Sequence, residues 1–408
     1  MRLVDYWLGA PLCFILDGLN SLSKITNLKR KRDKAPRKII FIKLSELGAI
    51  ILAYPLLKKI KECHPAAELF FVTFERNKGI FTLLGEAIPK ENILVIRENS
   101  LWLFISDSLK IIRKLRREDI DIIFDLDFFS RFTAVFAYLI KSRKRVGFYN
   151  YTFEGLYRGN LLTHKIQYNP LSHISKSYLS MSQVAIRESK DTPELEERIG
   201  GAEIILPKYI SKSGIKERVC EKLKRLKIDK DARLFLVNPG EGILPLREWP
   251  LSNFVFLSNA LLTDSKNYVV IVGTSGASQK GDAILKAVND SRCVSLIGET
   301  SLEELVELFN NSCALISNDC GLAHLAMFSS IKKFIIFGPE SPQVFGLIGE
   351  NSHMIYSGWP CSPCLSILNH RKSSCVDNRC LKAIKPDDIF ELIKESLNDK
   401  RLKEELEK

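Results

Sequence analysis

Residues 38–49 read KIIFIKLSELGA, an unbroken apolar strand pattern followed by a turn that contains Gly48. Residues 50–61 then carry apolar side chains at helical spacing, and ELFFVTF at residues 68–74 is a second apolar run. Strands that are continuously apolar rather than alternating are typical of a parallel sheet covered on both faces. The segment therefore predicts a strand, a crossover helix and a second, parallel strand.

The same alternation continues through the first half of the chain. We predict further elements at these positions: strands at 91–96, 119–127 and 144–148, and helices over 103–117 and 130–141. Residues 150–182 are rich in Tyr, His and Asn and lack clear periodicity, so no element is predicted there. The polar stretch at 189–200 has the composition of a linker.

The second half repeats this logic. Its predicted elements are strands within 232–240, 267–276, 293–300, 313–319 and 332–340, and helices over 253–263, over 278–289, from 302 and from 320. Ser301 and Glu304 have the capping-box spacing at the start of the third of these helices. We therefore predict an α/β protein with two Rossmann-like, doubly wound parallel-sheet domains that face a cleft. The predicted segments are an N-terminal domain at 38–188, a linker at 189–204, a C-terminal domain at 205–385 and a final helix at 386–408.

Composition narrows the class of protein. The chain has 408 residues, of which 22 are Gly, 16 are Pro and 46% are hydrophobic, and these values exclude collagen-like and low-complexity chains. The 60 Lys and Arg residues against 48 Asp and Glu residues give a net charge of +12, which favours an anionic partner. Six of the ten cysteines are scattered singly, a pattern typical of the reducing cytoplasm.

The N-terminal segment, residues 1–37, joins an apolar stretch at 3–19 to a run rich in Lys and Arg from residue 24 onwards. The charge follows the apolar stretch, the reverse of the order in a secretory signal. The stretch is shorter than the roughly 20 residues that span a bilayer, and Asp5 and Asp17 interrupt it. We therefore predict an interfacial anchor on an anionic membrane surface. The alternative is a helix packed on the protein's own surface beside a solvated charge run.

Strand-to-helix turns are where chemistry is expected, because ligands of such sheets bind beyond the carboxyl ends of the strands. The turn from Ser317 to His324 is built of small residues, so a phosphate can approach the N–H groups of the first helical turn. A plain N-cap by Asp319, with His324 in the core, is the alternative. The turn from Asn238 to Gly242 precedes Arg247, which has the reach to neutralise a diphosphate, and a surface arginine is the alternative there.

Six segments share their order and spacing with a known family: KLSELG at 43–48, NPGEG at 238–242 with LREWP at 246–250, NDCGLAHLA at 318–326 with FGPESP at 337–342, and CSPC at 361–364. Together they resemble glycosyltransferase family 9, the ADP-heptose:lipopolysaccharide heptosyltransferase family of GT-B fold. The resemblance implies an inverting transfer of a sugar, heptose or similar, from a nucleotide-diphosphate donor in the C-terminal domain. It also implies a lipid-linked saccharide acceptor in the N-terminal domain, a reaction that needs no cofactor, and no nucleic-acid partner.

The resemblance assigns roles to individual residues. It implies that the donor is bound by residues of the three turns: Lys43, Gly48, Asn238, Gly240, Arg247, Asp319, Cys320, Gly321 and His324. Arg247 also acts in catalysis by compensating the charge of the leaving diphosphate. The family's proposed general base is an Asp where this chain has Ala49, so the nearest carboxylate, Glu46, is predicted to replace it. A base from elsewhere in the chain and a loss of activity are the alternatives.

Two further features lie in the N-terminal domain. Asp125-Leu126-Asp127 has the DxD pattern that holds a metal in other sugar transferases, but we interpret it as a strand terminus and an acceptor contact. Residues 128–176 mix aromatic side chains with basic ones, among them Arg131, Arg145 and Arg158. These suit an anionic saccharide, and a basic solvated face is the alternative.

Four cysteines fall in a loop at 358–381 with the spacing C-x2-C-x10-C-x4-C: Cys361, Cys364, Cys375 and Cys380. Four thiolates at such a spacing can hold one structural Zn²⁺. An iron–sulfur cluster, disulfides and free thiols are the alternatives.

The sequence thus predicts a glycosyltransferase that works in the cytoplasm, peripherally bound to the inner face of the cytoplasmic membrane. Two other functions remain open at this stage. One is a nucleotide-sugar epimerase of the same fold, which would need neither an acceptor nor an anchor. The other is a catalytically degenerate member that binds sugar or nucleotide, an alternative that Ala49 keeps open.

Overall fold

The computed structural model describes residues 5, 7–26, 35–149, 157–188, 199–201, 204–206, 209–240 and 245–406. The chain divides into two compact units, residues 1–205 and 206–408, and each unit has its own sheet and core. Most of the predicted linker at 189–204 lies outside the described residues. The predicted cleft between the domains stays a prediction.

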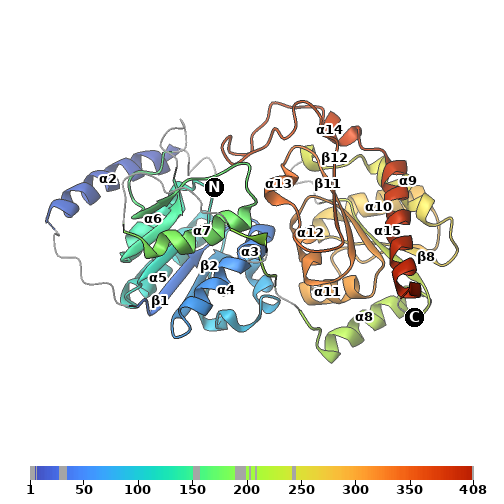
Figure 1. Cartoon of the computed structure of the whole chain (residues 1–408), viewed down its shortest axis with the longest axis horizontal. Helices are drawn as coiled ribbons and strands as arrows, with labels where there is room; N and C mark the ends of the chain where they lie inside the picture. Colours follow the sequence, from blue (N-terminus) through green and yellow to red (C-terminus); the bar gives the residue numbers. More distant parts are fainter. Residues whose placement is uncertain are drawn as a thin grey trace. The chain divides into compact units, whose positions relative to one another are not determined.

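The first unit holds a six-stranded parallel sheet in the order β3-β2-β1-β4-β5-β6 (Figure 1). Its strands are β1 (Lys38–Ile42), β2 (Glu68–Phe74), β3 (Ile93–Ile96), β4 (Ile122–Asp125), β5 (Lys144–Phe148) and β6 (His164–Ile166). Strand β1 lies between β2 and β4, with Ile40 opposite Phe70 on one side and Ile123 on the other. The strand order therefore reverses between β1 and β4, and ligands of such sheets bind at this point.

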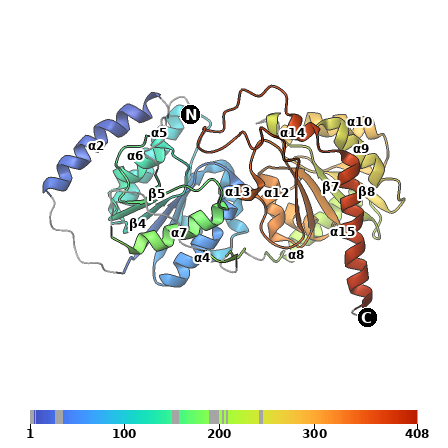
Figure 2. The same ribbon diagram turned by 45° about the horizontal axis from the view of Figure 1, so that its top comes forward.

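Helices cover the sheet of the first unit. They are α2 (Gly9–Thr26), α3 (Leu47–Leu52), α4 (Tyr54–Cys63), α5 (Leu101–Arg117), α6 (Arg131–Ile140) and α7 (Ile174–Ile186). Both α2 and α5 pack on α6, while α7 packs on α4 (Figures 1 and 2). Buried apolar side chains of β1, β2, β4, α5 and α6 form the main core of this unit.

The second unit repeats the architecture, with a parallel sheet in the order β12-β11-β10-β7-β8-β9. Its strands are β7 (Arg233–Asn238), β8 (Asn267–Ile271), β9 (Cys293–Ser295), β10 (Ala314–Asn318), β11 (Lys332–Phe337) and β12 (Ser352–Tyr356). The order reverses between β7 and β10, which pair with Leu236 opposite Leu315. The turns predicted to bind the donor follow these two strands.

The helices of the second unit are α8 (Ser213–Arg225), α9 (Leu251–Leu261), α10 (Ser278–Val288), α11 (Leu302–Asn310), α12 (Gly321–Leu325), α13 (Pro342–Phe345), α14 (Arg379–Lys382) and α15 (Pro386–Leu406). The capping box predicted for α11 is present, since Ser301 Oγ accepts from the Glu304 N–H and the Glu304 carboxylate accepts from the Ser301 N–H. Helix α15 runs along α9 (Figure 2).

The structure corrects three expectations. The single helix expected over 50–61 is two helices, α3 and α4, because Pro55 has no N–H to continue the hydrogen-bond ladder past Ala53. Residues 150–182 do contain elements, β6 and the start of α7. Helix α7 is buried on nearly all sides, so it lacks the polar face that gives a helix its sequence period. Strand β12 was also missed.

No helix among the described residues is long and apolar enough to cross a bilayer.

Candidate active site

The donor-side turn of the second unit is held together by two asparagines. Asn238, the last residue of β7, donates from Nδ2 to Ser317 Oγ at 2.9 Å and to Cys320 Sγ at 3.0 Å. Its Oδ1 accepts from the Gly240 N–H at 3.1 Å. Asn318, at the end of β10, donates to Pro239 O at 2.8 Å and accepts from the Trp249 N–H at 3.0 Å. The structure thus brings together the turns after β7 and β10, as the resemblance implied.

Gly240 lies where only glycine fits. Its φ is +87°, and a Cβ there would stand 3.2 Å from Asn318 Nδ2. The neighbouring residues 241–244, which include the predicted Gly242, lie outside the described part of the chain. Trp249 anchors the far end of this loop, because its buried indole N–H donates to Ile384 O at 2.9 Å.

Cys320 occupies the N-cap of α12, and Gly321 begins that helix. Burial raises the pKa of the Cys320 thiol, against the lowering effect of hydrogen bonding with the Ala323 N–H. A neutral thiol therefore stands beside the Asn238 amide. His324, one turn further along α12, is buried.

Four charged side chains gather at the carboxyl ends of β10 and β11. Arg247 forms an ion pair with Glu340 and lies 3.8 Å from Asp319 Oδ2. Arg371 Nε lies 3.0 Å from Glu340 Oε1. We call Arg247, Asp319, Glu340 and Arg371 the charged cluster.

The carboxylates of the charged cluster are deeply buried, and Glu340 is only 1% exposed. Burial raises the pKa of Glu340 to about 7, against the lowering effect of Arg247. Burial likewise raises the pKa of Asp319, and Arg247 again opposes the shift. Among the described residues, Asp319 Oδ2, Glu340 Oε2 and Arg247 Nε have no hydrogen-bond partner. Because Glu340 is only partly ionised near neutral pH, it offsets only part of the charge of the two arginines, which leaves positive charge for an anionic group.

Sequence reasoning missed Glu340 and Arg371. Glu340 follows β11, the neighbour of β10 in the sheet, so its place after a buried strand was a usable signal. Arg371 lies in the cysteine loop, and nothing in its local sequence relates it to the turns after β7 and β10.

The turn after β1 in the first unit centres on Lys43. This fully buried side chain places Nζ 2.8 Å from Asp127 Oδ1, 3.9 Å from Glu46 Oε2 and 4.4 Å from the ring centre of Phe128. The Leu44 N–H also donates to Asp127 Oδ2 at 2.9 Å. Lys43 therefore holds two carboxylates, and its predicted contact with the donor stays a prediction.

Glu46 stands at the entrance of α3 with φ +68°. A residue with a Cβ at positive φ costs about 1–2 kcal/mol, and such strain clusters at functional sites. Its side chain is 31% exposed, whereas that of Asp127 is 7% exposed. Gly48 and Ala49 are buried in α3. Of the carboxylates at this turn, Glu46 is thus the more accessible to an acceptor hydroxyl.

Asp125 and several basic residues that the sequence analysis singled out are buried inside the first unit. Asp125 forms a buried ion pair with Arg158 and accepts from Thr133 Oγ1 at 3.0 Å. Burial raises the pKa of Asp125, and Arg158 opposes the shift. The basic residues from 131 to 165 are mostly internal too, since these are all buried: Arg131, Arg145, Arg158, His164 and Lys165. Neither a solvated basic face nor an open saccharide site describes them.

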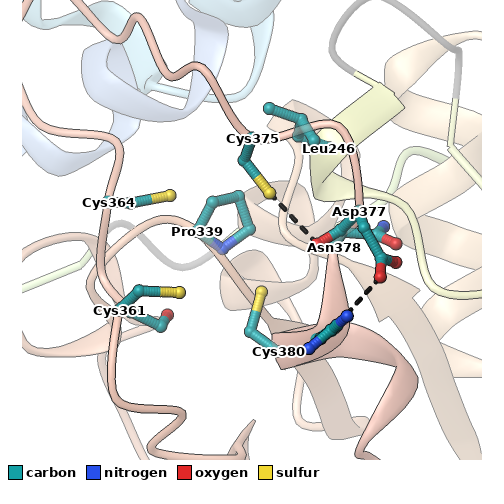
Figure 3. Close-up of a pocket in the computed structure, with 10 residues that line it drawn as sticks. Leu246, Pro339, Cys361, Cys364, Cys375, Asp377, Asn378 and Cys380 are labelled. Atoms are coloured by element: carbon teal, nitrogen blue, oxygen red, sulfur yellow. Dashed lines mark hydrogen bonds and ion pairs between the residues drawn. The ribbon is translucent and has the colours of Figure 1, made fainter.

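The four clustered cysteines line one small cavity of about 10 Å³ beside Pro339. Figure 3 shows Cys361 and Cys364 on one side of Pro339, and Cys375 and Cys380 on the other. Burial raises the pKa of Cys380, and the other three thiols add to this shift. All ten cysteines lie in the described part of the chain and are free thiols. No group of three or more described His, Cys, Asp or Glu side chains has an arrangement that could hold a metal ion.

Two doubly wound parallel sheets with polar turns at their switch points define a protein of the GT-B class. A solved structure of that class, Escherichia coli ADP-heptose lps heptosyltransferase II, matches with a TM-score of 0.67 at 19% identity, covering 89% of this chain and 99% of that one. The sequence profile of glycosyltransferase family 9 (heptosyltransferase) matches residues 108–374. The chain belongs to this family, which confirms the resemblance.

Curated relatives agree with the assignment. Lipopolysaccharide heptosyltransferase 1 of Campylobacter coli is 21% identical over 89% of this chain and 99% of its own length. Lipopolysaccharide heptosyltransferase 2 of Salmonella typhimurium is 27% identical over 43% of this chain. The chain thus matches only part of the length of these two relatives: 48% of the Salmonella protein and 34% of Haemophilus influenzae lipooligosaccharide heptosyltransferase 2. Family membership favours a transferase over an epimerase.

Proposed function

We propose that this protein is an inverting heptosyltransferase that moves a heptose or a similar sugar from a nucleotide-diphosphate donor to a lipopolysaccharide-core or other lipid-linked saccharide. The donor named for the similar Escherichia coli structure is ADP-heptose. The observation that carries the proposal is the charged cluster beside the turns after β7 and β10, at the switch point of the second sheet. Two arginines beside the Glu340 carboxyl, whose pKa is raised to about 7, suit a diphosphate that gains charge as it leaves.

The reaction is a single displacement. Glu46 takes the proton of an acceptor hydroxyl, and the acceptor oxygen forms a bond to the anomeric carbon of the sugar from the face opposite the diphosphate. The bond between that carbon and the diphosphate oxygen breaks, and the nucleoside diphosphate leaves with the electron pair. Arg247 and Arg371 balance its charge, while Asn238, Gly240, Asp319, Cys320, Gly321 and His324 form the surrounding turn. This route uses no cofactor.

Donor affinity is expected to fall as pH rises through about 7. Below this pH Glu340 is protonated, so it does not offset the charge of Arg247 and Arg371, whereas above it the ionised carboxylate competes with the diphosphate. Linkage of one proton to binding gives at most about a tenfold loss per pH unit. Titration calorimetry with ADP-heptose between about pH 6 and about pH 8.5 measures this, because a nucleotide sugar has no phosphate proton to lose in that range.

The variant Glu340→Gln is the matched control for the pH effect. Glutamine keeps the shape of the side chain but does not titrate, so its donor affinity should stay high and level across the range. A parent protein whose affinity does not change with pH, or a variant that keeps the same pH dependence, would show that Glu340 is not the linked group.

We propose that the cysteine loop takes up one structural Zn²⁺ on Cys361, Cys364, Cys375 and Cys380. The support is that all four thiols line one cavity, although they must draw closer together to act as ligands. Elemental analysis of the purified chain is expected to give one zinc per chain, lost in Cys364→Ser and kept in the control Cys220→Ser at an exposed lone thiol. If the purified chain contains neither zinc nor iron at close to one equivalent, the proposed metal site does not exist.

We further propose that the protein works in the cytoplasm and associates peripherally with the inner face of the membrane, where a lipid-linked acceptor is presented. The apolar helix α2 and the basic run that follows it support this proposal. Most of that run, residues 27–34, lies outside the described residues.

A further inference from the structure

Helix α2 is attached firmly to the first unit by one side. The Asp5 carboxylate accepts from the Phe132 N–H at 2.8 Å, at the start of α6. Gly9 lies so close to α6 that a Cβ there would meet Arg131 Cβ at 2.7 Å. Cys13 is fully buried in a small cluster with side chains of α6, and Asn20 donates to Asn160 O at 3.0 Å. Helix α2 is thus part of the acceptor domain rather than a tether beside it.

The opposite side of α2 is apolar and exposed. Between residues 7 and 22 no exposed residue carries a charge. The exposed large apolar side chains of the helix and of the two residues before it are Trp7, Leu8, Leu12, Phe14, Ile15, Leu19 and Leu22. An apolar surface of this kind on a soluble domain marks an interaction site.

Helix α5 carries a second apolar patch that the sequence reading did not single out. Its first half exposes Leu101, Trp102, Ile105 and Leu109, with the spacing that lines up on one face of a helix. Its second half exposes only basic side chains next to this patch: Lys110, Arg113, Lys114, Arg116 and Arg117. Apolar and basic residues are therefore adjacent on the outer side of α5.

The two patches belong to the same layer of the fold. Helices α2 and α5 both pack on α6 and flank it, while α4 and α7 pack on each other elsewhere in the unit (Figures 1 and 2). The basic run follows α2 directly in the sequence, so it places positive charge next to the apolar helix along the chain. Aromatic and aliphatic side chains bordered by Lys and Arg match the boundary between acyl chains and anionic headgroups.

We propose that α2 and α5 together form one membrane-docking surface that seats the acceptor domain on an anionic bilayer. This proposal adds a second helix to the membrane association proposed above, and it does not depend on the identity of the donor. A second copy of the chain is a poorer occupant, because the same surface on that copy exposes, in its described residues, apolar and basic side chains but no acidic partner for the basic residues of α5. The bilayer supplies acyl chains for the patch and anionic headgroups for its border.

Sedimentation of the full chain with vesicles tests the proposal. We compare vesicles of phosphatidylcholine alone with vesicles that contain phosphatidylglycerol, for the parent and for the double variant Trp102→Glu/Ile105→Glu. The parent should bind the anionic vesicles preferentially, and the variant should bind them at least about tenfold more weakly. Charge reversal at Arg113 and Lys114 should weaken binding to anionic vesicles alone, by about fivefold for each charge removed.

A matched control uses Ile186→Glu, because Ile186 at the end of α7 is 74% exposed and Trp102 is 75% exposed. Ile186 lies on the helix that packs on α4, so this variant should bind vesicles as the parent does. Vesicle binding that survives the α5 variants would overturn the two-helix surface. If the parent protein does not bind vesicles but forms a dimer, and the α5 variants disrupt that dimer, the patch is a self-association surface instead. Donor binding of every variant, measured alongside, should stay unchanged, and its loss would instead bear on the proposed transferase.

Discussion

Replacing Glu46 by Gln is expected to lower the rate of sugar transfer by about 10²- to 10⁴-fold, the usual contribution of a general base. Glutamine has the same shape but takes no proton at neutral pH, so the acceptor hydroxyl must attack while still protonated. The donor turn lies in the other unit, so donor affinity should be unchanged. Initial rates of transfer and calorimetric binding of ADP-heptose measure the two quantities separately.

The structural argument for Glu46 rests on accessibility and strain. Asp127, the other carboxylate near Lys43, accepts from both Lys43 Nζ and the Leu44 N–H and is nearly buried. Glu46 is partly exposed, and its backbone has a positive φ. Glu46 therefore combines an accessible carboxylate with a strained backbone, and both features are typical of residues at functional sites.

The control for this experiment is Glu68→Gln. Glu68 lies at the amino end of β2, whereas Glu46 follows the carboxyl end of the parallel strand β1, so the two residues are at opposite ends of the strands. This variant should transfer sugar at the parental rate. If Glu46→Gln also keeps the parental rate, the base lies elsewhere and Glu46 leaves the mechanism. If the parent itself binds donor but transfers no sugar to any acceptor, the protein is a degenerate, binding member of the family.

Replacing Arg247 by Ala is expected to weaken donor binding by about 30- to 1,000-fold, equivalent to about 2–4 kcal/mol, because it removes one of the two arginines that face the diphosphate. It also leaves Glu340 with Arg371 as its remaining cation in the charged cluster. The stability of the fold should therefore fall as well, although protonation of Glu340 limits that loss. Calorimetry with ADP-heptose and thermal unfolding measure the two effects.

Two further variants separate binding from folding. Arg247→Ala/Glu340→Gln removes the stranded carboxylate, so thermal stability should recover while donor affinity stays low. Arg225→Ala removes an exposed arginine of α8 in the same unit, paired with Glu299, and should change neither quantity. Donor affinity that returns together with stability would mean that Arg247 only supports the fold.

The helix and the strand that were missed within residues 150–182 share one cause. Helix α7 and strand β6 were missed because burial on all sides removes the alternation of polar and apolar residues. Three of the four serines of α7, Ser175, Ser180 and Ser182, donate to backbone carbonyls, as Ser175 Oγ does to Leu52 O at 2.7 Å, which makes these hydroxyls compatible with their surroundings. The basic residues near 145–165 were expected either to contact an anionic saccharide or to form a solvated face. Their burial could not be read from the sequence, because their partners are distant along the chain.

Local sequence was sufficient for the parallel α/β architecture, for ten of the twelve strands of the described chain and for the turns that follow β1, β7 and β10. Continuous apolar runs, turn glycines and capping residues act over a few positions, so they can be read without the fold. The charged cluster depended on tertiary structure, because Arg247, Asp319, Glu340 and Arg371 come from four separate segments that meet only when β7, β10 and β11 pair. The raised pKa of Glu340 and the joint apolar surface of α2 and α5 likewise arise from packing, since burial and exposure are properties of the folded chain.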